Sequence, residues 1–104
     1  MDFSLPAVQL ERLIRGTDPW PGAFTSVQGR ILKLWRATVV AEGFAQDTAP
    51  GTVLSTGKDG ILIRCGAGAL LIKEVQLEGK KRMEADAFLR GFSLPTGTVC
   101  GITS

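Results

Sequence analysis

Residues 52–77 read TVLSTGKDGILIRCGAGALLIKEVQL, and they contain the clearest signals of the fold class. It contains three apolar runs rich in β-branched residues, which favour extended strands over helices. Two short breaks separate the runs, and the Asp59-Gly60 pair in the first break is a strong signal for a tight hairpin turn. The predicted strands cover residues 52–55, 61–65 and 69–77.

Similar signals extend this pattern in both directions. Apolar runs with β-branched and aromatic residues predict further strands, and Gln28-Gly29 forms a turn between two of them. These strands cover residues 23–27, 31–41 and 98–102, with a polar loop over 43–51 and a charged loop over 78–82. Five or six short strands at intervals of roughly 8–12 residues predict a sandwich or a small barrel.

Two short helices are predicted near the ends of the chain. Ser4 can cap the first unpaired N–H groups, and Pro6 is tolerated in a first helical turn. Apolar residues then recur at helical spacing until Gly16, so we expect a helix over residues 5–15. A helix this short is marginal alone and must pack on another surface. A second helix is predicted over residues 84–90.

Composition limits the classes of function that this chain can have. Its 104 residues fit one domain, and 44% hydrophobic with 21% charged residues is typical of a globular protein. The net charge of +2 is too small to indicate nucleic-acid binding by itself. Cys65 and Cys100 lie in apolar runs, so we expect buried, reduced thiols that suit a cytoplasmic protein. No apolar run approaches the ~20 residues of a membrane span.

The sequence contains no complete catalytic or cofactor motif. Gly57-Lys58-Asp59 resembles a phosphate-binding loop, but its spacing from Gly51 is one residue too long and Asp59 replaces the magnesium-binding hydroxyl. The chain has no His and no Tyr, so the usual general bases reduce to carboxylates and lysines. Metal sites built from Cys and His are equally unexpected. We therefore predict no catalytic residue, no cofactor site and no metal site in this chain.

A set of short motifs resembles one protein family. The motifs, in chain order, are Leu5-Pro6-Ala7, Ile14-Arg15-Gly16, Asp18-Pro19-Trp20-Pro21-Gly22, Ala49-Pro50-Gly51, Gly79-Lys80-Lys81-Arg82-Met83 and Phe88-Leu89-Arg90-Gly91. They occur in the order seen in the C-terminal domain of folate-dependent formyltransferases and cover almost the whole chain. Within that superfamily, the run Gly79 to Met83 is most similar to methionyl-tRNA formyltransferases.

The resemblance implies a mainly β fold, an open Greek-key barrel similar to an OB-fold. On this basis residues 1–17 are a linker and helix from an interdomain region, and residues 18–104 are the barrel domain. The family's separate N-terminal catalytic domain, which uses 10-formyltetrahydrofolate, has no counterpart here, so the chain is either an excised domain or a stand-alone relative. With excision, we expect the helix face bearing Leu10, Leu13 and Ile14 to be partly exposed.

The resemblance also implies that the chain docks initiator methionyl-tRNA for formylation by that catalytic domain. Lys and Arg beside phosphates contribute to binding through counterion release. The candidate contacts are Lys80, Lys81, Arg82, Arg30, Lys33 and Arg36. The first three share a loop that can present them together to a backbone. Strand alternation places Arg30 and Arg36 on one face of their strand and Lys33 on the other.

Aromatic residues and two alternative functions complete the predictions. Trp20 and Trp35 are expected in the core rather than stacked on bases, because large aromatics dominate small cores. The chain could instead be the structural C-terminal domain of a sugar-nucleotide or folate formyltransferase, or a stand-alone OB-like interaction module. Salt-dependent binding of tRNA distinguishes the docking module from both alternatives.

Overall fold

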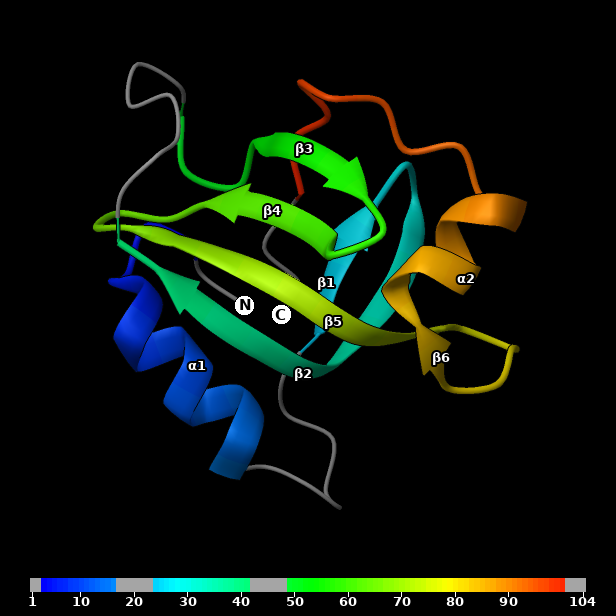
Figure 1. Cartoon of the computed structure of the whole chain (residues 1–104), viewed down its shortest axis with the longest axis horizontal. Coiled ribbons are helices and arrows are strands. Elements are labelled where there is room, and N and C mark those ends of the chain that lie inside the picture. Colours follow the sequence, from blue (N-terminus) through cyan, green and yellow to red (C-terminus); the bar gives the residue numbers. More distant parts are fainter. Residues whose placement is uncertain (1–2, 17–23, 42–48, 101–104) are drawn as a thin grey trace.

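The computed structural model describes residues 3–16, 24–41 and 49–100 of the chain (Figure 1). Its helices and strands are, in chain order, α1 (Ala7–Gly16), β1 (Phe24–Val27), β2 (Arg30–Val40), β3 (Val53–Gly57), β4 (Gly60–Arg64), β5 (Ala69–Leu77), β6 (Met83–Glu84) and α2 (Ala85–Gly91). The predicted mainly β fold with a short helix near each end is confirmed. The motif around Trp20 and most of the loop predicted over 43–51 lie outside the described residues.

The strands form one antiparallel sheet in the order β1-β2-β5-β4-β3, with β6 paired to β5. Strands β3, β4 and β5 follow one another as a meander that returns beside β2, which is a Greek key. Figure 1 shows β2 and β5 crossing the molecule side by side, with β2 bending into its hairpin with β1. Among the described residues β1 and β3 are not paired, so the barrel is open, as predicted.

The strand predicted over residues 98–102 is wrong for its described part. Val99 forms only an isolated bridge with Thr52. The residues just before Val99 form a turn, in which Thr98 N donates to the Pro95 carbonyl at 3.3 Å. The backbone then follows the edge of β3 for a few residues, and Cys100 N donates to the Gly51 carbonyl at 2.8 Å.

Helix α1 belongs to the same hydrophobic core as the sheet. It packs against β2 and β5, whereas α2 packs against β3, β4 and β5. Leu10 and Ile14 are 0% and 2% exposed, so the expectation that they would be partly exposed was wrong. Leu13, at 41% exposed, does face outward as predicted. The sheet needs a cover for its own apolar face, and α1 provides that cover without a second domain.

The segment before α1 is also fastened to the turn between β4 and β5. Gly66 N donates to the Phe3 carbonyl, and Ala7 N donates to the Ala67 carbonyl, both at 2.9 Å. A Cβ at Gly66 would lie 1.8 Å from the Ser4 carbonyl oxygen, so this close approach requires glycine. None of the described helices is long and apolar enough to cross a membrane.

Candidate nucleic-acid interface

A pair of bulges shapes the outer face of the sheet where β2 pairs with β5. Leu34 pairs with Val75 and Ala37 pairs with Ile72, but the ladder between these pairs is irregular. Strand β2 has one extra residue, Trp35, and β5 has one extra residue, Lys73, on either side of the pair formed by Arg36 and Glu74. One extra residue in a strand moves the side chains that follow it to the opposite face of the sheet. Because each of the two paired strands has one extra residue, this change of face occurs in both strands.

The two bulges place one cation of β2, Arg36, on a different face from the one that was predicted. Leu34 is buried, and Ala37, three residues later, packs against the same core. The two residues between them, Trp35 and Arg36, are therefore both on the outer face. Arg36 consequently shares its face with Lys33, and the prediction that the two point in opposite directions was wrong. Simple alternation fails here because it counts along one strand and ignores the register with its partner.

Trp35 lies in a polar surface cluster rather than in the core. The ammonium nitrogen of Lys33 is 4.0 Å from the centre of the Trp35 ring system, and the guanidinium carbon of Arg82 is 4.3 Å from it. The indole Nε1 donates to Gln76 Oε1 at 3.0 Å. The expectation of a core tryptophan was therefore wrong, because two cations contact its ring. Trp20 lies outside the described residues.

The amide of Gln76 links this cluster to the backbone of the basic loop. Gln76 is the register partner of Lys33, and its Nε2 donates to the Lys80 carbonyl at 3.0 Å. Arg82 in turn donates to Glu74 at 2.7 Å. The hydrogen bond from Arg82 holds the pKa of Glu74 below its usual range, so this carboxylate is charged at neutral pH. The loop is thus attached to β5 at both ends of its basic run.

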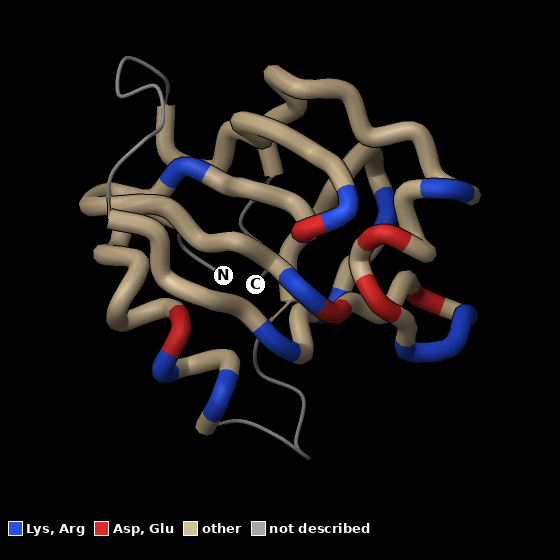
Figure 2. Tube along the Cα trace, viewed as in Figure 1, with Lys and Arg blue, Asp and Glu red and all other residues tan. Residues whose placement is uncertain are grey.

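The six candidate cations differ in their partners. Arg30 pairs with Glu78 at 3.3 Å, and Arg36 forms a looser pair with Glu84 at 3.8 Å. Arg82 pairs with Glu74, and Lys33 contacts the Trp35 ring. Lys80 and Lys81 are exposed and form no ion pair with any acid in the described ranges. Figure 2 shows basic residues along the loop between β5 and β6, with acidic residues on the neighbouring β6 and α2.

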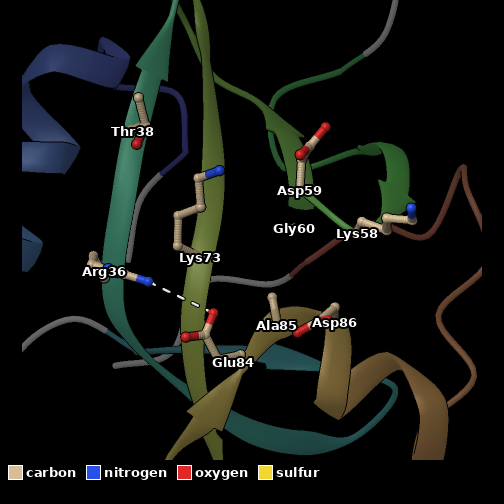
Figure 3. A pocket seen from close by; sticks show the side chains of 9 residues that line it. All are labelled: Arg36, Thr38, Lys58, Asp59, Gly60, Lys73, Glu84, Ala85 and Asp86. Atoms are coloured by element: carbon tan, nitrogen blue, oxygen red, sulfur yellow. Dashed lines mark ion pairs between the residues drawn. The ribbon is translucent and has the colours of Figure 1, made fainter.

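A polar pocket of about 320 Å³ adjoins the same face (Figure 3). Figure 3 shows the Lys73 side chain running between β2 and the turn that carries Lys58 and Asp59, while Arg36 points toward Glu84. Three cations and three carboxylates line the pocket: Arg36, Lys58, Lys73, Asp59, Glu84 and Asp86. Because the two signs balance, the pocket does not by itself select an anion.

Sequence reasoning missed Lys73, Glu74 and Gln76, and it misplaced Trp35. The sequence does contain one signal of the two bulges. Two adjacent polar residues, Lys73-Glu74, interrupt the apolar alternation of β5, and Trp35-Arg36 interrupts that of β2. Such a break is what a bulge produces in a half-buried strand, so matching breaks in two strands could have located the bulges.

The two thiols have no reactive character. Cys65 and Cys100 are buried, as predicted, and are not joined in a disulfide. Burial raises the pKa of each thiol to about 11, so both remain protonated at neutral pH. A protonated, enclosed thiol is a poor nucleophile.

Comparison with known proteins identifies the family. Residues 1–93 match the family of formyl transferase C-terminal domains, and the chain belongs to that family. It is 49% identical to a methionyl-tRNA formyltransferase of Lachnospira eligens, over 97% of this chain and 33% of the relative. It is 45% identical to one of Geobacter sulfurreducens, over 97% and 31%, and 47% identical to one of Myxococcus xanthus, over 94% and 30%. The chain thus spans about a third of the length of these relatives.

Proposed function

We propose that this chain is the C-terminal domain of a methionyl-tRNA formyltransferase and that it docks the initiator tRNA. Its partner is the N-terminal catalytic domain of the same parent protein, a cytoplasmic enzyme that takes formyl from 10-formyltetrahydrofolate. The observation that carries the proposal is the loop with Lys80, Lys81 and Arg82, which stands beside Lys33 and Arg36 on one outer face. The similarity to methionyl-tRNA formyltransferases supports it over almost the whole chain.

The chemistry of the site suits a phosphate backbone rather than base edges. Lys80 and Lys81 are exposed point charges, and such contacts position a nucleic acid without reading its sequence. Residues 18–104 would carry the docking surface, and residues 1–17, whose helix α1 packs on the sheet, would lead into it from the interdomain region. Base recognition and formyl transfer would then belong to the parent's catalytic domain.

One observation favours a second candidate. Arg30, Arg36 and Arg82 are each paired with a carboxylate of this chain, so half of the candidate cations are already neutralised. A surface of that kind also fits the structural C-terminal domain of a sugar-nucleotide or folate formyltransferase, which contacts no nucleic acid.

The test is a titration of initiator tRNA at several salt concentrations. The wild type is compared with the double variant Lys80→Ala, Lys81→Ala, which leaves the Arg82 contacts in place. Three neutralised phosphates give a slope of log affinity against log salt of about −2 to −3, and removing two contacts should reduce its magnitude by about 1.4–1.8. The matched control is Arg12→Ala, Arg15→Ala, which removes the same charge from the exposed side of α1.

The outcomes separate the candidates. An unchanged slope in the loop variant would move the tRNA contacts elsewhere, with Arg30 and Arg36 the next to be tested. Equal losses in both double variants would indicate a net-charge effect without a defined site. Absence of binding by the wild type at low salt would favour the sugar-nucleotide or folate enzyme.

A further inference from the structure

We propose that Trp35 is a positioning residue that holds the basic loop in the shape required to follow a nucleic-acid backbone. The inference deepens the proposed function and rests on it. It starts from the position of the side chain: the bulge in β2 places a large aromatic ring on the outer face, half-buried and outside the hydrophobic core.

Trp35 reaches the loop by two independent routes. The ring contacts the Arg82 guanidinium directly, at 4.3 Å from ring centre to carbon. The indole N–H reaches the Lys80 carbonyl through Gln76, by two hydrogen bonds of 3.0 Å each. The two routes end at the first and the last residue of the basic run, so Lys81 between them is presented outward.

The loop needs such support because of its charge. Three adjacent cations repel one another, and an unsupported loop would spread over many conformations. Glu74 neutralises Arg82 at 2.7 Å, and the Trp35 ring gives the same guanidinium a second favourable contact. A loop ordered before binding loses less conformational entropy when it meets a ligand, so its affinity is higher.

The same contacts argue against a base-stacking role for the ring. Lys33 and Arg82 both lie over it, and a nucleobase would have to displace at least one of them. Trp35 therefore acts on the ligand through the loop. Removal of the Trp35 ring should therefore reduce the order of the loop and leave its charge unchanged.

The first experiment needs no nucleic acid. Trypsin cleaves after Lys and Arg, so cleavage after Lys80, Lys81 and Arg82 reports the opening of this loop. In Trp35→Leu we expect cleavage there to rise about five- to tenfold, from the loss of a cation–π contact and a hydrogen bond. Cleavage after Lys58, in the turn between β3 and β4, should not change. Thr38→Val, on the exposed side of the same strand, is the control and should digest like the wild type.

The second experiment measures tRNA affinity across salt concentrations. Trp35→Leu should weaken binding about fivefold with an almost unchanged salt slope, because it removes no charge. In a background that lacks all three loop cations (Lys80→Ala, Lys81→Ala, Arg82→Ala), the same substitution should have no further effect. A loss of affinity that persists in that background would overturn the inference, because the ring would then contact the tRNA itself.

Two further outcomes are separated by design. If the wild type does not bind tRNA, the proposed function fails, while the trypsin experiment still decides whether Trp35 orders the loop. If Trp35→Leu does not fold, Gln76→Leu replaces it, since it breaks only the route to the Lys80 carbonyl. Wild-type rates of cleavage at the loop in the folded variant would refute the positioning role.

Discussion

Helix α1 carries two leucines, three positions apart, whose substitution by alanine should have very different effects. Leu10 is 0% exposed and lies in the core that the helix shares with the sheet, whereas Leu13 is 41% exposed. Alanine is at least as good a helix former as leucine, so neither change weakens the helix itself. The difference between the two variants therefore measures how firmly α1 is docked on the sheet.

The expected magnitudes follow from burial. Replacing a fully buried leucine by alanine removes apolar burial and leaves a cavity, which together cost about 2–5 kcal/mol. Leu13 is already largely in water, so its truncation should cost less than about 1 kcal/mol. A domain of this size is stable by about 5–15 kcal/mol in total, and Leu10→Ala would thus remove a large share of the free energy of unfolding.

Urea unfolding followed by circular dichroism measures both variants. With a slope of about 2 kcal/mol per molar urea, Leu10→Ala should lower the midpoint by roughly 1–2.5 M and Leu13→Ala by less than about 0.5 M. Two small and equal shifts would refute the reasoning. In that case α1 would be a separate interdomain segment, as an excised linker would require, and not part of this fold.

Two further predictions concern a tight turn and the buried thiols. Gly60 has a φ of +128°, and a Cβ there would lie 2.1 Å from the Ile72 carbonyl oxygen, so Gly60→Ala should cost about 2–5 kcal/mol in urea unfolding. Gly57→Ala, in the same hairpin with nothing within 4 Å, should cost less than about 1 kcal/mol. For Cys65 and Cys100, folding raises the pKa from 9.0 to about 11 and so favours the protonated thiol. Their contribution to stability should be complete below pH 9 and fall between pH 9 and about 11; an unchanged free energy of unfolding over that interval would contradict the burial of the thiols.

The local signals in the sequence were sufficient for most of the strands and turns, although not for the strand predicted over residues 98–102. The strand predicted over residues 69–77 matches β5 (Ala69–Leu77), and the tight turn predicted at Asp59-Gly60 joins β3 to β4, with Gly60 at a positive φ. Such features depend on neighbouring residues, so a single sequence contains them. The burial of α1 was predicted less well. The expected exposure of Leu10 assumed that α1 packs on a missing domain, whereas α1 packs on the sheet of this chain.

The side chains that lie on the outer face could not be predicted by counting residues along one strand. In the order Leu34-Trp35-Arg36-Ala37, strict alternation would place Arg36 on the same side as Leu34, inside the core. An unpaired guanidinium buried there would cost far more than a local break in the ladder. The bulge at Trp35 removes that conflict, and the matching bulge at Lys73 keeps Ile72 and Val75 buried on the partner strand.

The same two irregularities bring residues of the proposed interface together. They bring Trp35, Arg36 and Glu74 to the outer face, where Trp35 and Glu74 contact Arg82 and thereby fix the basic loop to the sheet. A regular ladder with the same sequence would direct Arg36 toward the core, at a high cost in stability. The position of the proposed interface is therefore set by the register between β2 and β5.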